Sequence, residues 1–161
     1  FAALPASADG VRSRALPPME MVFMGHRQLH RKRRYTLAEL GEQEILTFQR
    51  GSLPHVAVVD LFRQAAVEPK RVHTISSISA MVQLVQGGFG VATLPRSAVQ
   101  RLLTFPNLKQ LSCEAALQPL PIHASYRTDP PTQAVETVVR SAFTYMDVSN
   151  AGRRSSKKSM K

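Results

Sequence analysis

Residues 72–95, VHTISSISAMVQLVQGGFGVATLP, constrain the fold of this chain more than any other stretch. The β-branched residues in 71–75 predict a strand. Ser76 and Ser77 follow as natural N-caps, because a serine oxygen accepts a hydrogen bond from a free amide of the first helical turn. Apolar residues then recur at spacings of three and four, on one helical face: Ile78, Met81, Val82 and Val85. The first half of the stretch therefore predicts a strand followed by a capped helix.

The second half predicts the end of that helix and a second strand. Gly87 and Gly88 are expected to stop the helix, because glycine adopts the left-handed C-terminal conformation without a Cβ penalty. Residues 89–94 form a short apolar run without charge, as in a strand buried on both faces, and Pro95 marks its end. Strand, helix and strand in this order predict a right-handed βαβ crossover onto a parallel sheet.

The start of the predicted helix is also a candidate binding position. In open α/β sheets, ligands bind beyond the carboxyl ends of strands and against helix N-termini. Ser76 and Ser77 therefore either contact a ligand or serve only as caps. The pattern alone leaves both alternatives open.

Residues 74–95 resemble the effector-binding domain of LysR-type transcriptional regulators. In that family a Ser-rich helix start, a Val-x-x-Gly-x-Gly turn and a Leu-Pro strand end recur together. Other segments resemble the same domain in the same order and extend the resemblance over about residues 10–148. They are 16–27, the first crossover strand between subdomains; 35–40, a short turn; 44–52 (EILTFQRGS), the next strand and its ligand-facing loop; and 122–146, the closing strand and final helix.

The resemblance implies an α/β fold of the type 2 periplasmic-binding-protein kind. Its parts would be a Rossmann-like subdomain with a parallel-rich sheet flanked by helices, and the remainder of a second subdomain. We expect residues 1–24 to hold the end of the first subdomain and the first crossover strand, and 25–95 the effector-binding subdomain. Residues 96–148 would hold the return crossover and the closing strand and helix. Residues 149–161, charged and poor in apolar side chains, are expected to be a disordered basic tail.

The chain opens on Phe1 and not on methionine, so we expect a fragment. The resemblance implies that the DNA-binding helix-turn-helix and the first strands lie upstream. The final helix is predicted over 133–146, with an apolar face made of Val135, Val138, Val139, Ala142, Phe143 and Met146.

The net charge of +10 is concentrated in two short segments. Ten of the 21 Lys and Arg residues lie in residues 27–34 and 153–161, and the rest equal the eleven acidic residues in number. A nucleic-acid-binding fold usually spreads basic residues over a face and interleaves them with aromatic or polar side chains. Residues 26–34 are therefore interpreted as a solvated basic loop, and contact with DNA phosphate or an acidic partner is the alternative.

The sequence contains no coupled acid–base constellation, so we expect no enzymatic activity. It has no phosphate loop, dinucleotide fingerprint or Gly-x-Ser-x-Gly elbow, and no cofactor is expected. His26 and His30 are the only i,i+4 histidine pair, and their basic surroundings disfavour a metal ion. Cys113 is the only cysteine, which excludes an internal disulfide and fits a reducing compartment.

The candidate site residues converge on the carboxyl edge of the predicted sheet. Arg50 follows a strand and is placed to pair with a carboxylate, although a plain surface arginine is the alternative. Gly51 allows close backbone approach, and Ser52 offers a hydroxyl at the next helix start. The resemblance implies an effector site between two subdomains, and the candidates carried over are Met24, Arg50, Gly51, Ser52, Thr74, Ser76 and Ser77.

Together these features predict the effector-sensing domain of a bacterial LysR-type regulator. It would bind a small anionic metabolite, such as a carboxylate, and contact DNA only through the upstream domain. We expect a homo-oligomer in the cytoplasm with no membrane partner, because no apolar run is long enough to span a bilayer and the first residues lack the positive region and apolar stretch of a signal peptide. The alternative is a solute-binding protein of a transport system with the same fold.

Overall fold

The computed structural model describes residues 2, 4–102, 105, 107–129 and 133–158, and for residues 100–102 and 146–158 it describes the backbone alone. The chain forms two compact units. Unit 1 comprises Phe1–Pro18 and Pro121–Lys161, and unit 2 comprises Met19–Leu120. The chain thus changes unit at residues 18–19 and 120–121, whereas the division drawn from the sequence changes at 24–25 and 95–96.

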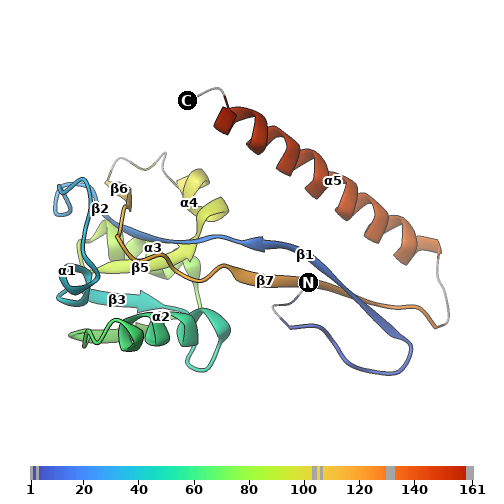
Figure 1. Cartoon of the computed structure of the whole chain (residues 1–161), viewed down its shortest axis with the longest axis horizontal. Coiled ribbons are helices and arrows are strands. Elements are labelled where there is room, and N and C mark those ends of the chain that lie inside the picture. Colours follow the sequence, from blue (N-terminus) through green and yellow to red (C-terminus); the bar gives the residue numbers. More distant parts are fainter. Residues whose placement is uncertain (1, 3, 103–104, 106, 130–132, 159–161) are drawn as a thin grey trace. The chain divides into compact units, whose positions relative to one another are not determined.

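Unit 2 is built on a five-stranded sheet with the strand order β4-β3-β5-β2-β6 (Figure 1). β3 is parallel to both β4 and β5, and β2 is antiparallel to β5 and β6. Only β2 therefore runs against the other four strands. The strands are β2 (Met21–His26), β3 (Glu44–Thr47), β4 (Arg71–Thr74), β5 (Val91–Pro95) and β6 (Leu108–Leu111). This mixed, parallel-rich sheet confirms the fold class predicted from the sequence.

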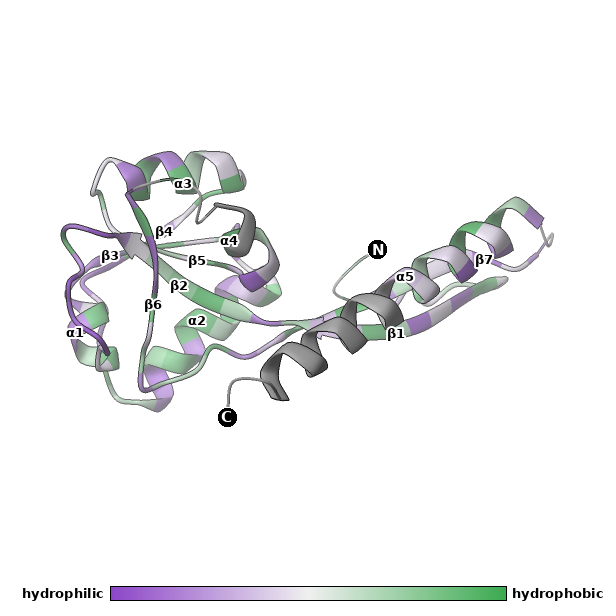
Figure 2. Ribbon diagram, turned by 90° about the horizontal axis from the view of Figure 1, so that it is seen from above, coloured by the Kyte–Doolittle hydropathy of each residue, from purple (hydrophilic) through white to green (hydrophobic). Residues whose placement is uncertain are grey.

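Helices cover both faces of this sheet (Figure 2). α1 (Leu37–Gly41) and α2 (Leu53–Gln64) pack on one face, and α3 (Ile78–Gln86) and α4 (Arg96–Leu102) pack on the other. A hydrophobic core lies on each face of the sheet, and successive residues of a strand point into opposite cores, as the two-residue period of a strand requires. Ile45 lies with Phe62 of α2, and Leu46 lies with Met81 of α3.

The predicted strand–helix–strand unit is present as β4, α3 and β5. Met81, Val82 and Val85 of α3 are buried, while Ile78 is 37% exposed. Ser77 is the N-cap, since its side chain accepts a hydrogen bond from the Ala80 amide at 3.3 Å. Helix, cap and strand follow from the sequence pattern, and the structure assigns the cap to the second of the two serines.

β5 begins at Val91, so the prediction that the strand starts at Phe89 is wrong. Gly88 has a φ of +77°. Its amide donates to the Val85 carbonyl at 3.0 Å, and the Phe89 amide donates to the Leu84 carbonyl at the same distance. These bonds form the Schellman arrangement that closes a helix. Phe89 therefore belongs to the helix terminus, where 45% of its surface is exposed.

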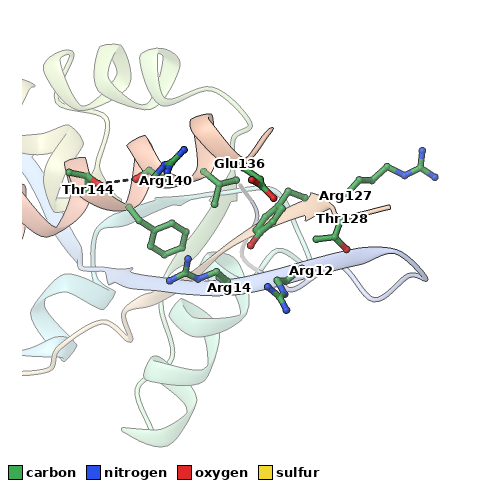
Figure 3. Close-up of a pocket in the computed structure, with 10 residues that line it drawn as sticks. Arg12, Arg14, Arg127, Thr128, Glu136, Arg140 and Thr144 are labelled. Atoms are coloured by element: carbon green, nitrogen blue, oxygen red, sulfur yellow. Dashed lines mark hydrogen bonds between the residues drawn. The ribbon is translucent and has the colours of Figure 1, made fainter. Parts of the chain in front are cut away.

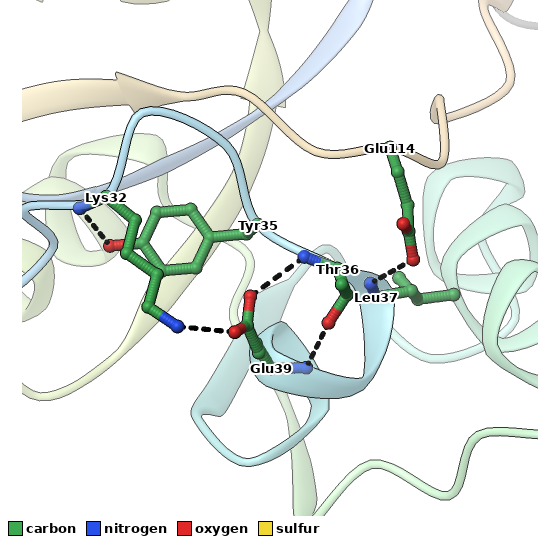
Figure 4. A network of polar contacts seen from close by, with 6 residues as sticks. All are labelled: Lys32, Tyr35, Thr36, Leu37, Glu39 and Glu114. Carbon is green, nitrogen blue, oxygen red and sulfur yellow. Dashed lines mark hydrogen bonds and ion pairs between the residues drawn. The ribbon is translucent and has the colours of Figure 1, made fainter.

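α1 replaces the turn expected at residues 35–40 with a short helix that carries a complete capping box (Figure 4). The Thr36 hydroxyl accepts from the Glu39 amide at 3.2 Å, and the Glu39 carboxylate accepts from the Thr36 amide at 2.9 Å. Glu114, distant in sequence, accepts from the Leu37 amide at 3.2 Å. The first turn of α1 is therefore stabilised both by its own capping box and by Glu114, which follows β6.

Unit 1 contains a two-stranded sheet of β1 (Val11–Met19) and β7 (Leu120–Arg127), and the helix α5 (Gln133–Lys158). The apolar face of α5 is only half-buried at Val135, Val139, Ala142 and Phe143, and Val138 is 65% exposed. The side chain of Met146 lies outside the described residues. α5 continues to Lys158, so the segment expected to be a disordered tail is helical over residues 149–158, although Ser, Asn and Gly make up half of it and have low helix propensity.

None of the described helices has the length and apolar character needed to cross a membrane.

Candidate functional site

The carboxyl ends of β3 and β4 meet at one edge of the unit 2 sheet. Thr47 and Thr74, the last residues of these strands, are paired in register. The Ile75 amide donates to the Thr47 carbonyl at 2.8 Å, which extends the pairing by one residue. The loop after β3 and the start of α3 are therefore neighbours. We call this edge, with residues 48–52 and 74–77, the rim.

Arg50 and Gly51 form an open corner of the rim. Gly51 has a φ of +80°, and no atom lies within 4 Å of the position that a Cβ would take. Arg50 is exposed, and no described acidic residue forms an ion pair with it. A free guanidinium beside an uncrowded backbone can bind a carboxylate through two parallel hydrogen bonds.

Ser52 occupies the N-cap position of α2 without capping the helix. Its side chain takes no amide of the first turn, and its Oγ is buried with no hydrogen-bond partner among the described residues. Leaving a buried hydroxyl unsatisfied is unfavourable. The Gly51 amide donates to Nδ1 of His55, in the first turn of the helix, at 3.4 Å. Ser52 thus holds a free donor at a helix start beside Arg50.

Thr74 and Ser76 add exposed hydroxyl groups on the neighbouring strand end, whereas Ser77 is used as the cap. The two helix starts nearby carry the positive ends of the helix dipoles, which favour an anion. Six of the seven candidate residues therefore lie on this rim: Arg50, Gly51, Ser52, Thr74, Ser76 and Ser77.

Met24 does not lie on the rim. It is fully buried, pairs with Ala92 in the middle of the sheet, and packs in the core under α3 and α4. In the β2–β5 register, Met21 is the residue that reaches the carboxyl end of β5, opposite Pro95. The structure therefore places this candidate three residues inside the sheet.

Two buried threonines support the rim, and the sequence-based reasoning missed them. Thr93 of β5 donates its hydroxyl hydrogen toward Oγ1 of Thr47, 3.0 Å away, and both side chains are fully buried. A polar pair between adjacent strands fixes the end of β3, from which the Arg50 loop departs. The only signal in the sequence is a threonine in each of two otherwise apolar strands.

Two other ionisable residues of unit 2, Glu44 and Cys113, have shifted pKa values. Glu44 accepts from Nε2 of His73 at 2.7 Å and pairs with Lys70 at 3.4 Å, and these contacts lower the pKa of the carboxyl group. This cluster sits on the first residue of β3, at the edge opposite the rim. Burial raises the pKa of the Cys113 thiol, which disfavours the reactive thiolate. No group of three metal-ligating side chains occurs in the part of the chain that the structure describes.

Unit 1 has a cavity of about 400 Å³ that the sequence did not predict (Figure 3). Its lining includes four arginines, from β1, the end of β7 and α5: Arg12, Arg14, Arg127 and Arg140. The Arg14 guanidinium lies 3.9 Å above the centre of the Phe143 ring, a cation–π contact. Figure 3 shows Arg127 extending away from Arg14, so the guanidinium groups do not converge on one point.

Comparisons with known proteins agree on one family. The family model described as the LysR substrate binding domain matches residues 1–146. A search of curated protein sequences finds no match.

Three solved structures illustrate the similarity of fold. The regulatory domain of Synechocystis CcmR in complex with 2-PG has a TM-score of 0.72 at 17% identity, over 90% of this chain and 71% of that chain. The QuiR effector-binding domain in complex with shikimate has a TM-score of 0.69 at 19% identity, over 86% and 66%. Full-length CbnR bound to its target DNA has a TM-score of 0.62 at 25% identity, over 84% and 49%.

The match over residues 1–146, nearly the whole described chain, agrees with the mixed sheet and with the order of its elements. The fold is the type 2 periplasmic-binding-protein-like fold of these regulatory domains. The chain belongs to the LysR substrate binding domain family.

Proposed function

We propose that this chain is the effector-sensing domain of a LysR-type transcriptional regulator and that it binds a small anionic metabolite at the rim of unit 2. The observation that carries the proposal is the exposed Arg50, which has no ion-pair partner among the described residues and stands beside the starts of α2 and α3. Two of the similar solved structures are described as complexes with 2-PG and with shikimate. Both descriptions are of small molecules bound to regulatory domains.

The chemistry of binding follows from the groups on the rim. The Arg50 guanidinium donates two hydrogen bonds to a carboxylate, and the Ser52 hydroxyl, which has no described partner, donates a third. Thr74 and Ser76 supply hydroxyl groups for the polar remainder of the ligand. These contacts recognise an anion without breaking or forming a bond, so the protein acts as a regulator and not as a catalyst.

Binding would act on transcription through the rest of the regulator. A ligand shifts a conformational equilibrium only by its difference in affinity for the two states. We propose that effector binding favours one arrangement of a cytoplasmic homo-oligomer, and that the DNA-binding domain responds to it. The alternative of a transport protein with the same fold is not favoured, because the matching family is one of regulators.

Isothermal titration of the purified protein with small carboxylates tests the proposal. For a carboxylate that binds, Arg50→Ala should remove a charge-assisted contact of about 1.5 to 3 kcal/mol, or roughly tenfold to a hundredfold in affinity. Arg63→Ala is the matched control, because Arg63 lies at the other end of α2 and, in the part of the chain that the structure describes, pairs with Asp60 alone, at 2.8 Å. An equal loss of affinity in both variants, or none in either, would place the ligand elsewhere.

A further inference from the structure

The loop between β2 and α1, residues 27–34, which we call the basic loop, exposes five cations. They are Arg27, Arg31, Lys32, Arg33 and Arg34. β2 runs antiparallel to β5, so the end of β2 lies at the amino end of β5. The basic loop is therefore on the edge of the sheet opposite the rim, and the proposed effector site does not use it.

A buried histidine anchors the basic loop. The His30 amide donates to the His26 carbonyl at 2.9 Å, and the His30 ring is 5% exposed. The ring lies so close above Gly25 that a Cβ there would come within 2.7 Å of its Nδ1. It also meets Tyr35 edge-on, with 6.0 Å between the ring centres. The middle of the loop is thus fixed to the end of β2.

Further hydrogen bonds fix the second half of the loop, and Figure 4 shows the one between Lys32 and Tyr35. The Lys32 amide donates to the Tyr35 hydroxyl at 3.2 Å. Lys109 of β6 donates through Nζ to the carbonyls of His30 and Lys32, at 3.2 and 3.1 Å. The loop backbone is therefore held in one conformation, and a sixth cation lies beneath it.

The four arginines of the basic loop keep their charges free. Arg27 and Arg31 donate to backbone carbonyls of Leu108 and Gln28, at 3.3 and 3.0 Å. Lys32 alone pairs with an acidic side chain, that of Glu39. Within the described residues, no carboxylate forms an ion pair with Arg27, Arg31, Arg33 or Arg34. Like charges this close repel each other, and an anionic partner removes that repulsion.

We propose that the basic loop binds the phosphate backbone of duplex DNA, without reading its sequence, in addition to the contacts made by the regulator's DNA-binding domain. The inference rests on the proposed function, which places this chain in a protein that binds DNA. Arginine suits the task because its planar fork matches a phosphate in two hydrogen bonds. A loop that is already ordered loses little conformational entropy on binding.

The composition of the loop favours duplex DNA over other polyanions. Proteins that hold single strands stack bases on aromatic side chains. The basic loop exposes none, since the His30 ring is buried and Tyr35 lies behind the loop with its hydroxyl engaged. Protein interfaces centre on buried apolar anchors. The loop offers one exposed apolar residue, Leu29. Phosphate contacts by arginine alone agree best with this surface.

The test is the salt dependence of binding to a 20-base-pair duplex of arbitrary sequence, measured by fluorescence anisotropy without any effector. Three Arg→Gln changes in the loop, at Arg31, Arg33 and Arg34, should lower the slope of log affinity against log salt by about 2.7, or about 0.9 for each lost contact. The control changes Arg12, Arg127 and Arg140 to Gln. These arginines are also exposed, so the same charge is lost. The slope of the control variant should change by less than about one unit.

Three outcomes would overturn the proposal: an equal change in both variants, which reports only net charge; no change in the loop variant; or tighter binding of single-stranded DNA or polyglutamate than of duplex through the same arginines. Circular dichroism on each variant checks that it is folded. The loop variant should keep its affinity for carboxylates, because the rim lies at the other edge of the sheet. Failure of the effector proposal would therefore show in calorimetry and not in the anisotropy experiment.

Discussion

At the level of single residues, close backbone packing decides which positions of unit 2 must stay glycine. A Cβ on Gly90 would lie 2.1 Å from the Glu44 carbonyl oxygen, which is backbone and cannot move aside. A Cβ on Gly87 would meet only carbonyl oxygens at 3.5 Å, and Gly87 has an ordinary helical φ of −76°. The two positions therefore make a matched pair.

We predict that Gly90→Ala lowers the free energy of unfolding by about 3 kcal/mol, because the added methyl group forces β5 away from β3. Gly87→Ala should leave stability unchanged or raise it by up to about 1 kcal/mol, since alanine restricts the unfolded chain. Urea denaturation of the three proteins measures both values. Equal stabilities would show that β5 can shift without cost.

His30 gives a prediction about pH. Burial, followed by the nearby charges of His26 and Lys109, lowers its pKa, and the hydrogen bond to the His26 carbonyl only partly opposes this shift. The unfolded chain therefore binds a proton more readily than the folded one. Stability from neutral His30 is present above about pH 6.5 and is lost as the pH falls below that value.

The expected result is a midpoint of thermal unfolding that decreases between about pH 7 and pH 5.5, more steeply in the natural protein than in His30→Gln. The variant controls for the other histidines, which titrate in both proteins. Parallel pH profiles for the two proteins would rule out a contribution from His30.

At the level of helices and strands, sequence patterns predict the features that depend only on residues close together in the chain. The α3 face and the β4 and β5 strands follow from period and glycine placement. The pattern Thr36-x-x-Glu39 is the sequence signature of the capping box of α1. The family resemblance, in contrast, implies only a short turn there. The sequence alone assigns Phe89 to the strand, because apolar character does not distinguish a helix terminus from a buried strand. That difference depends on the left-handed conformation of Gly88 and on the two hydrogen bonds that close α3.

The choice between Ser76 and Ser77 leads to a separation of roles. Ser77→Ala should lower the free energy of unfolding by about 1 kcal/mol, because its hydroxyl caps α3. Ser76→Ala should change stability by less than about 0.5 kcal/mol, since its exposed side chain makes no hydrogen bond among the described residues. Chemical denaturation distinguishes them, and a larger loss in Ser76→Ala would contradict the cap assignment.

At the level of the whole molecule, the two units differ in how much core they have. Unit 2 contains nearly all of the buried apolar side chains, and among the described residues of unit 1 only Leu16 and Ala124 are buried. The two-stranded sheet and the half-buried face of α5 leave unit 1 with little to protect its backbone. Local stability should therefore differ between the units.

We predict faster amide hydrogen exchange in β7 and α5 than in α3 and β5. Backbone hydrogen bonds open more often where few apolar contacts hold them. Exchange followed by mass spectrometry on peptides from 122–146 and 72–95 gives the comparison. Equal protection in both regions would mean that unit 1 is as stable as unit 2.

Most residues of the rim can be predicted from the sequence. Strand ends and helix starts are local features, and parallel strands bring them to one edge, so Arg50 and Ser76 are found without coordinates. Met24, a candidate that the family resemblance alone supplies, lies inside the sheet because the register of β2 against β5 decides which residue reaches the edge, and a single sequence does not contain that register. The Thr47–Thr93 pair and the contact of Arg14 with Phe143 also depend on packing between distant segments.

Binding of a small anion at the rim can be followed residue by residue with nuclear magnetic resonance. The ¹⁵N-labelled protein would be titrated with 2-PG, shikimate and other small carboxylates, with chloride as the control for ionic strength. We predict that a binding carboxylate shifts the amide signals of residues 50–53 and 74–78, and that Arg50→Ala needs roughly tenfold to a hundredfold more carboxylate for the same shifts. Shifts confined to the residues around Arg14 in unit 1, or none with any carboxylate, would contradict binding at the rim.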